Sequence, residues 1–194
     1  VLAMDSYVIQ DNGSTGGFWD YQNFGVAGSV ILQPEAMRFR GIPVLTNTPP
    51  KGAQRGPGEN QTANILEPIL DKGARKLGID RLALRLVNTP GGGTGAKVGP
   101  KRVPVTSAYL REGLIQAAKK FDYANRVKKS GKQANGKIRS IGIGQAYHAA
   151  GYNGWDGMVR ITPDGKLHIH TGVGNLGTYS YAATSRVAAE VLGY

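Results

Sequence analysis

The chain has 194 residues, with 24 lysines and arginines against 13 acids, 29 glycines and no cysteine. A chain of this length forms one good hydrophobic core or two small ones. The lack of cysteine excludes an iron–sulfur cluster, a zinc–thiolate site or a disulfide carried by this chain. No apolar run reaches the roughly 18 residues of a membrane span, so we expect no span and a cytoplasmic location, with the periplasm as the alternative.

The positive charge is concentrated in one stretch. Residues 97–139 contain twelve Lys and Arg and two acids, which gives this stretch a net charge of +10 against +11 for the whole chain. Such a stretch is a solvated linker, a surface for an acidic partner or a nucleic-acid-binding segment. No aromatic interleaving or recognisable module supports binding to nucleic acid. We therefore favour a linker first and a partner surface second.

Two strands are predicted within the first fifty residues. Residues 1–10 are rich in β-favouring side chains, and Met37–Thr48 alternates between apolar and polar residues. Pro43 restricts the second strand to a sheet edge or a break. Between the strands, residues 18–24 contain four aromatic side chains. A plug in the core or an interface is the first interpretation of this cluster, and the wall of a substrate funnel is the second.

The most informative stretch is Gln54–Gln61, Gln-Arg-Gly-Pro-Gly-Glu-Asn-Gln, which we name the arginine loop. Its two glycines and its proline favour a tight loop between the second strand and a helix. Backbone N–H groups and a planar guanidinium at the start of a helix suit an oxygen-rich, anionic group. A second glycine loop, residues 172–178, follows much later in the sequence. We expect the two loops to meet around a cofactor.

A helix is predicted after the arginine loop, and a shorter one follows it. Pro68 lies within the first pattern, so that helix either kinks there or begins near Glu67. Gly78 is a natural helix-ending residue, and Asp80 is the predicted N-cap of a helix that extends to Asn88. Apolar residues at helical spacing predict one buried stripe on the first helix: Ile65, Leu66, Ile69, Leu70, Ala74 and Leu77.

The middle of the chain contains one further helix and the predicted domain boundary. The helix covers Ser107–Tyr123, and the polar, basic, turn-rich segment 126–140 is the boundary. The glycine run at residues 91–95 lacks the Lys-Ser/Thr pair of a phosphate-binding loop, so a flexible connection is favoured over a phosphate site. One face of the helix carries apolar residues: Leu110, Leu114, Ala117, Ala118 and Phe121.

The C-terminal part is predicted to contain a β-hairpin and a helix. Met158–Ile161 and Lys166–Thr171 flank Thr-Pro-Asp-Gly at residues 162–165, which is a strong turn signal. His168 and His170 share a strand face, and we favour a solvent-facing pair over metal ligands because no third ligand lies nearby. A helix over residues 178–192 follows, with Thr178 or Ser180 as its cap and Gly193 at its end.

No catalytic triad or pair of catalytic carboxylates can be assembled from the sequence. None of the three histidines lies in a known nucleophile motif. Glu59 and Glu67 occupy helix positions, which favours structural roles over catalysis. Anion-binding loops without an acid–base pair favour cofactor binding over autonomous catalysis.

Several motifs, taken in order, resemble the molybdenum-binding large subunit of the xanthine dehydrogenase/aldehyde oxidase family. That family has the patterns Arg-Gly-x-Gly-x-x-Gln, a helix with a glutamate, Leu-Gly-x-Asp and Leu-Arg-x-x-Asn. The corresponding segments here are Arg55–Gln61, Glu67, Leu77–Asp80 and Leu84–Asn88, followed by Gly142–Tyr147, Asp164-Gly165 and Val187–Gly193. The resemblance implies an α+β fold with two subdomains that are incomplete without other chains or segments.

The resemblance also implies a division of the chain. Residues 1–125 would be the end of a first molybdopterin-binding subdomain, residues 126–140 a basic linker, and residues 141–194 the start of a second such subdomain. The implied cofactor is molybdenum-molybdopterin, with the cytosine dinucleotide as one form. The implied reaction oxidises an aldehyde or N-heterocycle type of carbon with a water-derived oxygen, and electrons pass to iron–sulfur clusters and FAD on partner chains. The alternative is a non-catalytic assembly subunit of such a complex.

Site residues follow from the resemblance position by position. No residue ligates the metal directly, and Tyr147 and His148 fall where the family places substrate-pocket side chains. Thr178 occupies the position of a family glutamine, and the family's catalytic glutamate is absent from this chain. We expect the remaining portions of the molybdenum-binding subunit, an iron–sulfur subunit, a flavin subunit and a small-molecule substrate as partners. The implied cofactor-binding residues are Ala53, Gln54, Arg55, Gly56, Gly174, Gly177 and Thr178.

Overall fold

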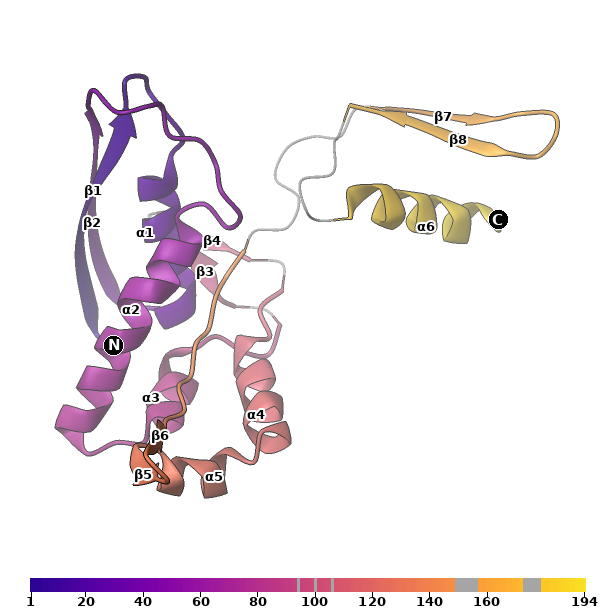
Figure 1. Cartoon of the computed structure of the whole chain (residues 1–194). Coiled ribbons are helices and arrows are strands. Elements are labelled where there is room, and N and C mark those ends of the chain that lie inside the picture. Colours follow the sequence, from indigo (N-terminus) through magenta and orange to yellow (C-terminus); the bar gives the residue numbers. More distant parts are fainter. Residues whose placement is uncertain (94, 100, 106, 149–156, 173–178) are drawn as a thin grey trace. The chain divides into compact units, whose positions relative to one another are not determined.

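The computed structural model describes residues 1–194 except 94, 100, 106, 149–156 and 173–178 (Figure 1). Its contacts divide the chain into two compact units, residues 1–148 and 149–194. Helices and strands are mixed in both, in agreement with the predicted α+β class. Segment 126–140 lies within the first unit. Its role as a linker between two subdomains stays a prediction.

The first unit begins with a parallel pair of strands joined through a helix. Strand β1 (Ala3–Gly13) pairs with β2 (Ala36–Leu45), and helix α1 (Asp20–Leu32) connects them (Figure 1). Side chains alternate between a half-buried face and an exposed face in both strands. The predicted strands are therefore confirmed, and Pro43 lies on a strand with an open edge among the described residues.

The core of the first unit lies between α1 and helix α2 (Glu59–Leu77). Phe24 of the aromatic cluster is buried there, whereas Phe18 is 37% and Trp19 62% exposed. A core role is therefore confirmed for Phe24, and an interface or a funnel wall stays a prediction for the exposed rings. Close packing depends on Gly25, where an added Cβ would lie 2.9 Å from the Phe39 ring. The buried core residues are Phe24, Ile31, Leu32, Leu66 and Leu70, with Met4, Val8, Phe39, Leu84, Leu110 and Tyr147 packed around them.

The start of helix α2 and the width of its buried stripe both differ from the predictions. It begins at Glu59 and runs through Pro68, so a helix that begins near Glu67 is wrong. Its buried stripe is narrower than predicted, because Ile65 and Ile69 are 50% and 56% exposed. Leu66, Leu70 and Ala74 recur every four residues and stay on one face, while residues one position earlier are rotated by about 100° away from it. Leu77, at 67% exposure, also lies outside the stripe.

Helix α3 (Arg81–Asn88) begins as predicted. The Asp80 carboxylate accepts hydrogen bonds from Leu82 N at 2.9 Å and Ala83 N at 3.0 Å. Gly78 ends α2 in the left-handed region with φ of 66°. Both cap predictions are confirmed.

Short elements complete the first unit. The predicted helix over Ser107–Tyr123 is shorter, because α4 covers Leu110–Lys120, and none of its residues is buried. In the glycine run, Gly92 N donates to Glu112 Oε1 at 2.7 Å, so this amide is already bound to an anionic group. The other elements are β3 (Lys97–Val98), β4 (Val103–Pro104), α5 (Tyr123–Arg126), η1 (Val127–Lys129), β5 (Lys132–Ala134) and β6 (Lys137–Arg139).

The second unit contains the predicted hairpin and helix. Strands β7 (Gly157–Ile161) and β8 (Leu167–Thr171) are antiparallel, and Gly165 N donates to Thr162 O at 2.8 Å in the turn. His168 and His170 are exposed, and no group of three or more potential metal ligands occurs among the described residues. Helix α6 covers Ser180–Leu192. Tyr179 holds its N-cap position, so Ser180 as the cap is wrong.

No helix in the part of the chain that the structure describes is long and apolar enough to cross a membrane.

Candidate functional site

The arginine loop is tied to α1 by hydrogen bonds. Asn23 Nδ2 donates to Pro57 O at 3.0 Å, and Thr62 Oγ1 donates to Gly58 O at 2.7 Å and to Phe24 O at 3.2 Å. Gly58 has a φ of 76°, and an added Cβ would lie 2.1 Å from Asp20 O. Only glycine therefore fits at this position. The last turn before α2 is fixed to the core.

The tip of the same loop is open. Ala53, Gln54 and Arg55 are exposed, and Gly56 is half-buried. The Arg55 guanidinium makes no hydrogen bond or ion pair with any described residue. The loop thus combines a base that is fixed to the core with an exposed, unpaired guanidinium just before a helix. Such a group is available for an anionic ligand.

Two predicted site regions meet at the start of α2. His148 Nδ1 contacts Glu59 Oε2, and the two residues are 89 positions apart in sequence. The Glu59 side chain is 8% exposed and that of His148 is 62% exposed. His148 therefore lies beside the arginine loop with most of its ring in solvent. Tyr147, the other predicted substrate-pocket residue, is half-buried and packs against the hydrophobic core.

An extended segment, residues 141–148, brings His148 to this position. We name it the strap. Arg81 Nη1 donates to Ile141 O at 3.1 Å, and Arg85 Nη2 donates to Ile143 O at 3.4 Å. Further along, the buried Gln145 accepts from Thr89 Oγ1 at 2.8 Å. Side chains from α3 and the residue after it therefore hold the strap before it reaches Glu59.

The strap rests on a buried polar cluster between α2 and α3. Arg85 is fully buried, and its guanidinium lies 2.7 Å from Glu67 Oε2 and 2.8 Å from Asp71 Oδ1. Arg81 also pairs with Asp71, at 3.1 Å. Burial raises the pKa of Glu67, against the opposing effects of the Arg85 guanidinium and of the Gln145 backbone N–H. A buried guanidinium with two carboxylates and a backbone carbonyl fixes the geometry of three segments at once.

Sequence reasoning missed this cluster, although a signal was present. Glu67 and Asp71 are four residues apart on α2, and Arg81 and Arg85 are four residues apart on α3. Side chains at this spacing share one helix face. Two complementary pairs on consecutive helices therefore indicate an interhelical ion cluster.

Most of the second glycine loop lies outside the described residues. Gly174, Gly177 and Thr178 lie outside the described residues. The proposed meeting of residues 172–178 with the arginine loop stays a prediction.

Comparisons with known proteins agree with the motif order. Two models described as molybdopterin cofactor-binding domains match this chain, at residues 1–89 and 116–194. A putative xanthine dehydrogenase molybdenum-binding subunit of Escherichia coli K12 is 32% identical over 76% of this chain and 20% of its own length. The aldehyde oxidoreductase molybdenum-binding subunit PaoC of the same strain is 28% identical, over 87% of this chain and 23% of its own.

Two further comparisons extend over most or all of the chain. A probable xanthine dehydrogenase subunit of Bacillus subtilis 168 is 27% identical over 100% of this chain and 26% of its own length. The crystal structure of the aldehyde oxidoreductase from Desulfovibrio desulfuricans superimposes with a TM-score of 0.64 at 23% identity, over 87% of this chain and 19% of that one. At this identity the superposition shows a shared fold. The chain spans between 20% and 26% of these curated relatives.

Proposed function

Because the chain belongs to the xanthine dehydrogenase/aldehyde oxidase family of molybdopterin cofactor-binding proteins, we propose that it forms one side of a molybdopterin site in a molybdenum-dependent oxidoreductase. The substrate class we propose is an aldehyde or an electron-poor N-heterocycle. The names of the relatives, xanthine dehydrogenase and aldehyde oxidoreductase, support this choice. The observation that carries the proposal is the exposed, uncommitted Arg55 on a loop fixed to the core.

The described residues fit an anionic cofactor. Arg55 supplies a planar fork of donors for oxygen ligands or phosphate oxygens. Gln54 adds an amide that both donates and accepts, and the exposed backbone at Ala53 permits close approach. The cofactor, when bound, supplies the oxidation of carbon with a water-derived oxygen. The chain's own share is binding, orientation and electrostatics.

His148 is proposed to face the substrate. Glu59 contacts Nδ1 of its ring, which leaves Nε2 free to contact a substrate atom. The strap and the Glu67–Arg85 cluster keep the ring in this orientation. The second glycine loop is proposed to form the opposite side of the cofactor site, through Gly174, Gly177 and Thr178. The Thr178 hydroxyl would donate a single hydrogen bond.

The rest of the enzyme is proposed to come from other segments or chains. This chain contains no cysteine, so iron–sulfur clusters would be held elsewhere. We propose the remaining portions of the molybdenum-binding subunit, an iron–sulfur subunit and a flavin subunit as partners. The cytosine dinucleotide is one proposed form of the cofactor.

Replacement of Arg55 tests the proposal. In the purified complex that contains this chain, Arg55→Ala is expected to lower the molybdenum and pterin content at least about tenfold. Loss of a hydrogen bond from a charged group costs about 1.5–3 kcal/mol. Arg139→Ala, which removes another exposed arginine, is the matched control and should retain both. Absence of molybdenum and pterin from the fully assembled wild-type complex would contradict the proposal. Normal content and activity in Arg55→Ala would favour the non-catalytic assembly role instead.

A further inference from the structure

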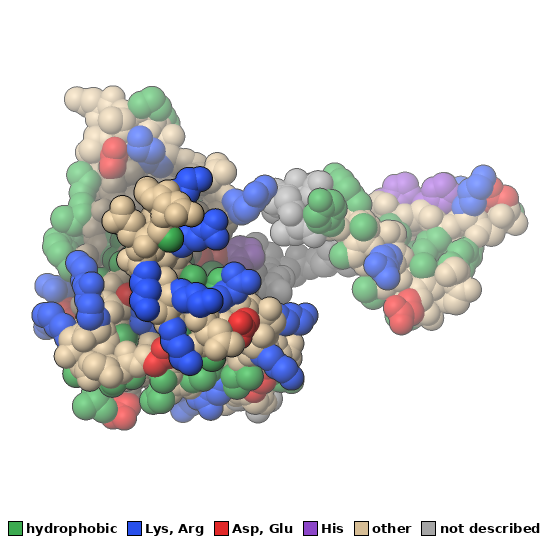
Figure 2. Space-filling view, turned by 60° about the horizontal axis from the view of Figure 1, so that its bottom comes forward, with side chains coloured by type: hydrophobic (Ala, Val, Ile, Leu, Met, Phe, Trp, Pro, Cys, Tyr) green, Lys and Arg blue, Asp and Glu red, His purple; other side chains and the backbone are tan. Residues whose placement is uncertain are grey.

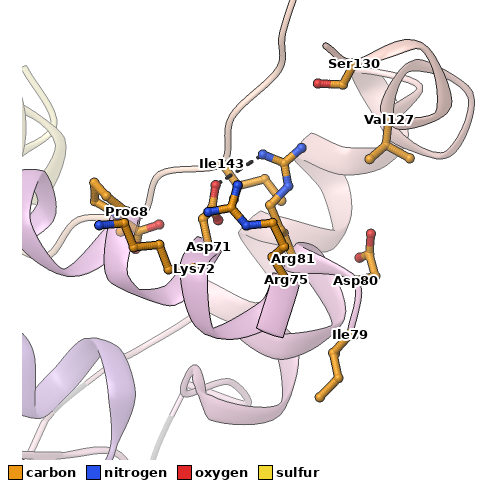
Figure 3. A pocket seen from close by; sticks show the side chains of 11 residues that line it. Pro68, Asp71, Lys72, Arg75, Ile79, Asp80, Arg81, Val127, Ser130 and Ile143 are labelled. Carbon is orange, nitrogen blue, oxygen red and sulfur yellow. Dashed lines mark hydrogen bonds and ion pairs between the residues drawn. The ribbon is translucent and has the colours of Figure 1, made fainter. Parts of the chain in front are cut away.

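A hollow of the first unit lies along the C-terminal half of α2. Its volume is about 760 Å³. Residues from α2, the start of α3, η1 and the strap line it (Figure 3). Arg55 precedes the first residue of α2, so the hollow is separate from the arginine loop.

Three carboxylates line the hollow, and each is already engaged. Glu67 and Asp71 are paired with Arg85, and Asp71 also with Arg81. Asp80 accepts hydrogen bonds from two α3 amides and from Tyr123 Oη at 2.9 Å. Glu67 Oε1 has no hydrogen-bond partner among the described residues, but this atom is buried and out of reach of a ligand. The acidic groups therefore offer a ligand few open acceptors.

The cations of the hollow are less engaged. The Lys72 ammonium and the Arg75 guanidinium make no hydrogen bond or ion pair with any described residue. Arg81 uses Nη1 for Asp71 and Ile141 O, which leaves donors on its other nitrogens. Figure 3 shows Arg75 and Arg81 next to each other, beside Asp71 and Ile143, and Lys72 pointing away from them toward Pro68. Two arginines thus bring free donors to a place where the carboxylates offer few free acceptors.

The surroundings strengthen the positive potential. Lys and Arg side chains gather on this face of the first unit (Figure 2). Arg126, Lys128 and Lys129 are exposed and adjoin the lining residue Val127 in sequence. A concave site with one sign of uncommitted charge concentrates ions of the opposite sign.

The remaining walls are apolar. Pro68, Ile79, Val127 and Ile143 line the same hollow as the cations. Pockets for small organic molecules combine such apolar walls with a few convergent polar groups, in volumes of about 300–1,000 Å³. A free inorganic ion would leave these walls without a contact.

We propose that this hollow binds a small organic oxyanion. Its phosphate or carboxylate head contacts Arg75 and Arg81, and its apolar body packs against Val127 and Ile143. Arginine forks bind both kinds of head.

The test measures binding to the purified complex by titration calorimetry, with phenyl phosphate, benzoate and inorganic phosphate as probes. We expect saturable binding of phenyl phosphate or benzoate, and the tighter of the two identifies the head group. That probe should bind about tenfold tighter than inorganic phosphate, because its ring buries apolar surface. Failure of both aromatic probes to bind would overturn the proposal. Equal affinity for inorganic phosphate would also overturn it, because only general charge attraction would then be present.

Two variants locate the binding. Arg75→Ala should weaken binding of the aromatic probe at least about tenfold. The Arg75 side chain is exposed and unpaired, so the melting temperature should not change. Lys119→Ala, on α4, is the matched control with the same loss of charge. An equal loss of affinity in this control would place the binding outside the hollow and overturn the proposal. Val127→Ala should weaken binding of the aromatic probe and leave inorganic phosphate unaffected.

Discussion

The imidazole of His148 contacts the buried carboxylate of Glu59, which is the first residue of α2 and part of the arginine loop. This contact joins the end of the strap to the predicted cofactor loop. It gives the two regions a defined relative position within the first unit. The strap therefore helps to fix the orientation of the start of α2.

Loss of the His148 side chain should loosen the start of α2. His148→Ala leaves the Glu59 carboxylate buried without this partner, at a cost of about 1–3 kcal/mol. Hydrogen exchange of the amides in residues 59–62 should accelerate in the assembled complex. His170→Ala removes an exposed histidine of β8 and should leave these amides unchanged. The double variant Glu59→Gln/His148→Ala should lose less amide protection than the sum of the losses in Glu59→Gln and His148→Ala. Additive losses would show that the pair is not coupled.

Replacement of Arg85 should be strongly destabilising. Arg85→Ala leaves Glu67 and Asp71 without the guanidinium between them, and removal of one partner from a buried pair costs about 3–5 kcal/mol. The melting temperature should fall, and proteolysis within residues 141–148 should accelerate. Arg75→Ala removes an unpaired arginine from the neighbouring helix and serves as the control. Similar melting temperatures for the two variants would contradict a structural role of the cluster.

Gly58→Ala should detach the arginine loop from α1. The substitution requires a positive φ from a residue with a Cβ, which costs roughly 1–2 kcal/mol, and it adds a clash with Asp20 O at 2.1 Å. Thermal stability and cofactor retention should both decrease. Gly52→Ala, where an added Cβ meets no atom within 4 Å, should leave both unchanged. A stable Gly58→Ala variant with full cofactor content would show that the loop does not need this close contact.

Acid should destabilise residues 45–51, the segment that precedes the arginine loop. The hydroxyl of Thr46 lowers the pKa of Asp11 below its ordinary 3.8, with help from the Gly13 N–H, the Thr48 hydroxyl and Lys51. Because the folded-state pKa is the lower one, the ionised carboxylate stabilises the folded state. This contribution is fully present above pH 3.8 and disappears as the pH falls through the lowered value.

Asp11→Asn tests this dependence. Above pH 3.8 the wild type should protect the amides of residues 45–51 from hydrogen exchange better than the variant does. The difference should vanish as the pH falls through the lowered pKa of Asp11. A difference that persists unchanged in acid would rule out Asp11 as its cause.

Local chemistry explains which features could be predicted. Asp80 as a cap, Gly78 as a helix end and the turn at residues 162–165 depend on neighbours within a few positions, and all three are confirmed. The exposed Arg55 on a glycine-rich loop before a helix also followed from local sequence.

Long-range packing explains what was missed. Ile65 looked equivalent to Leu66 by spacing, and only the position of α1 decides which one is buried. The strap contacts depend on an arginine that lies 58 residues away from Ile143. The His148–Glu59 contact likewise depends on the path of the strap, which no local pattern specifies.

The two-stranded sheet has a consequence for biosynthesis. Among the described residues, β1 and β2 pair only with each other, and Tyr7, Ile9 and Leu45 are 53%, 62% and 67% exposed. Open strand edges beside apolar side chains are templates for aggregation. During synthesis this sheet would therefore be a site of aggregation until a further segment pairs with its edges or covers its exposed face.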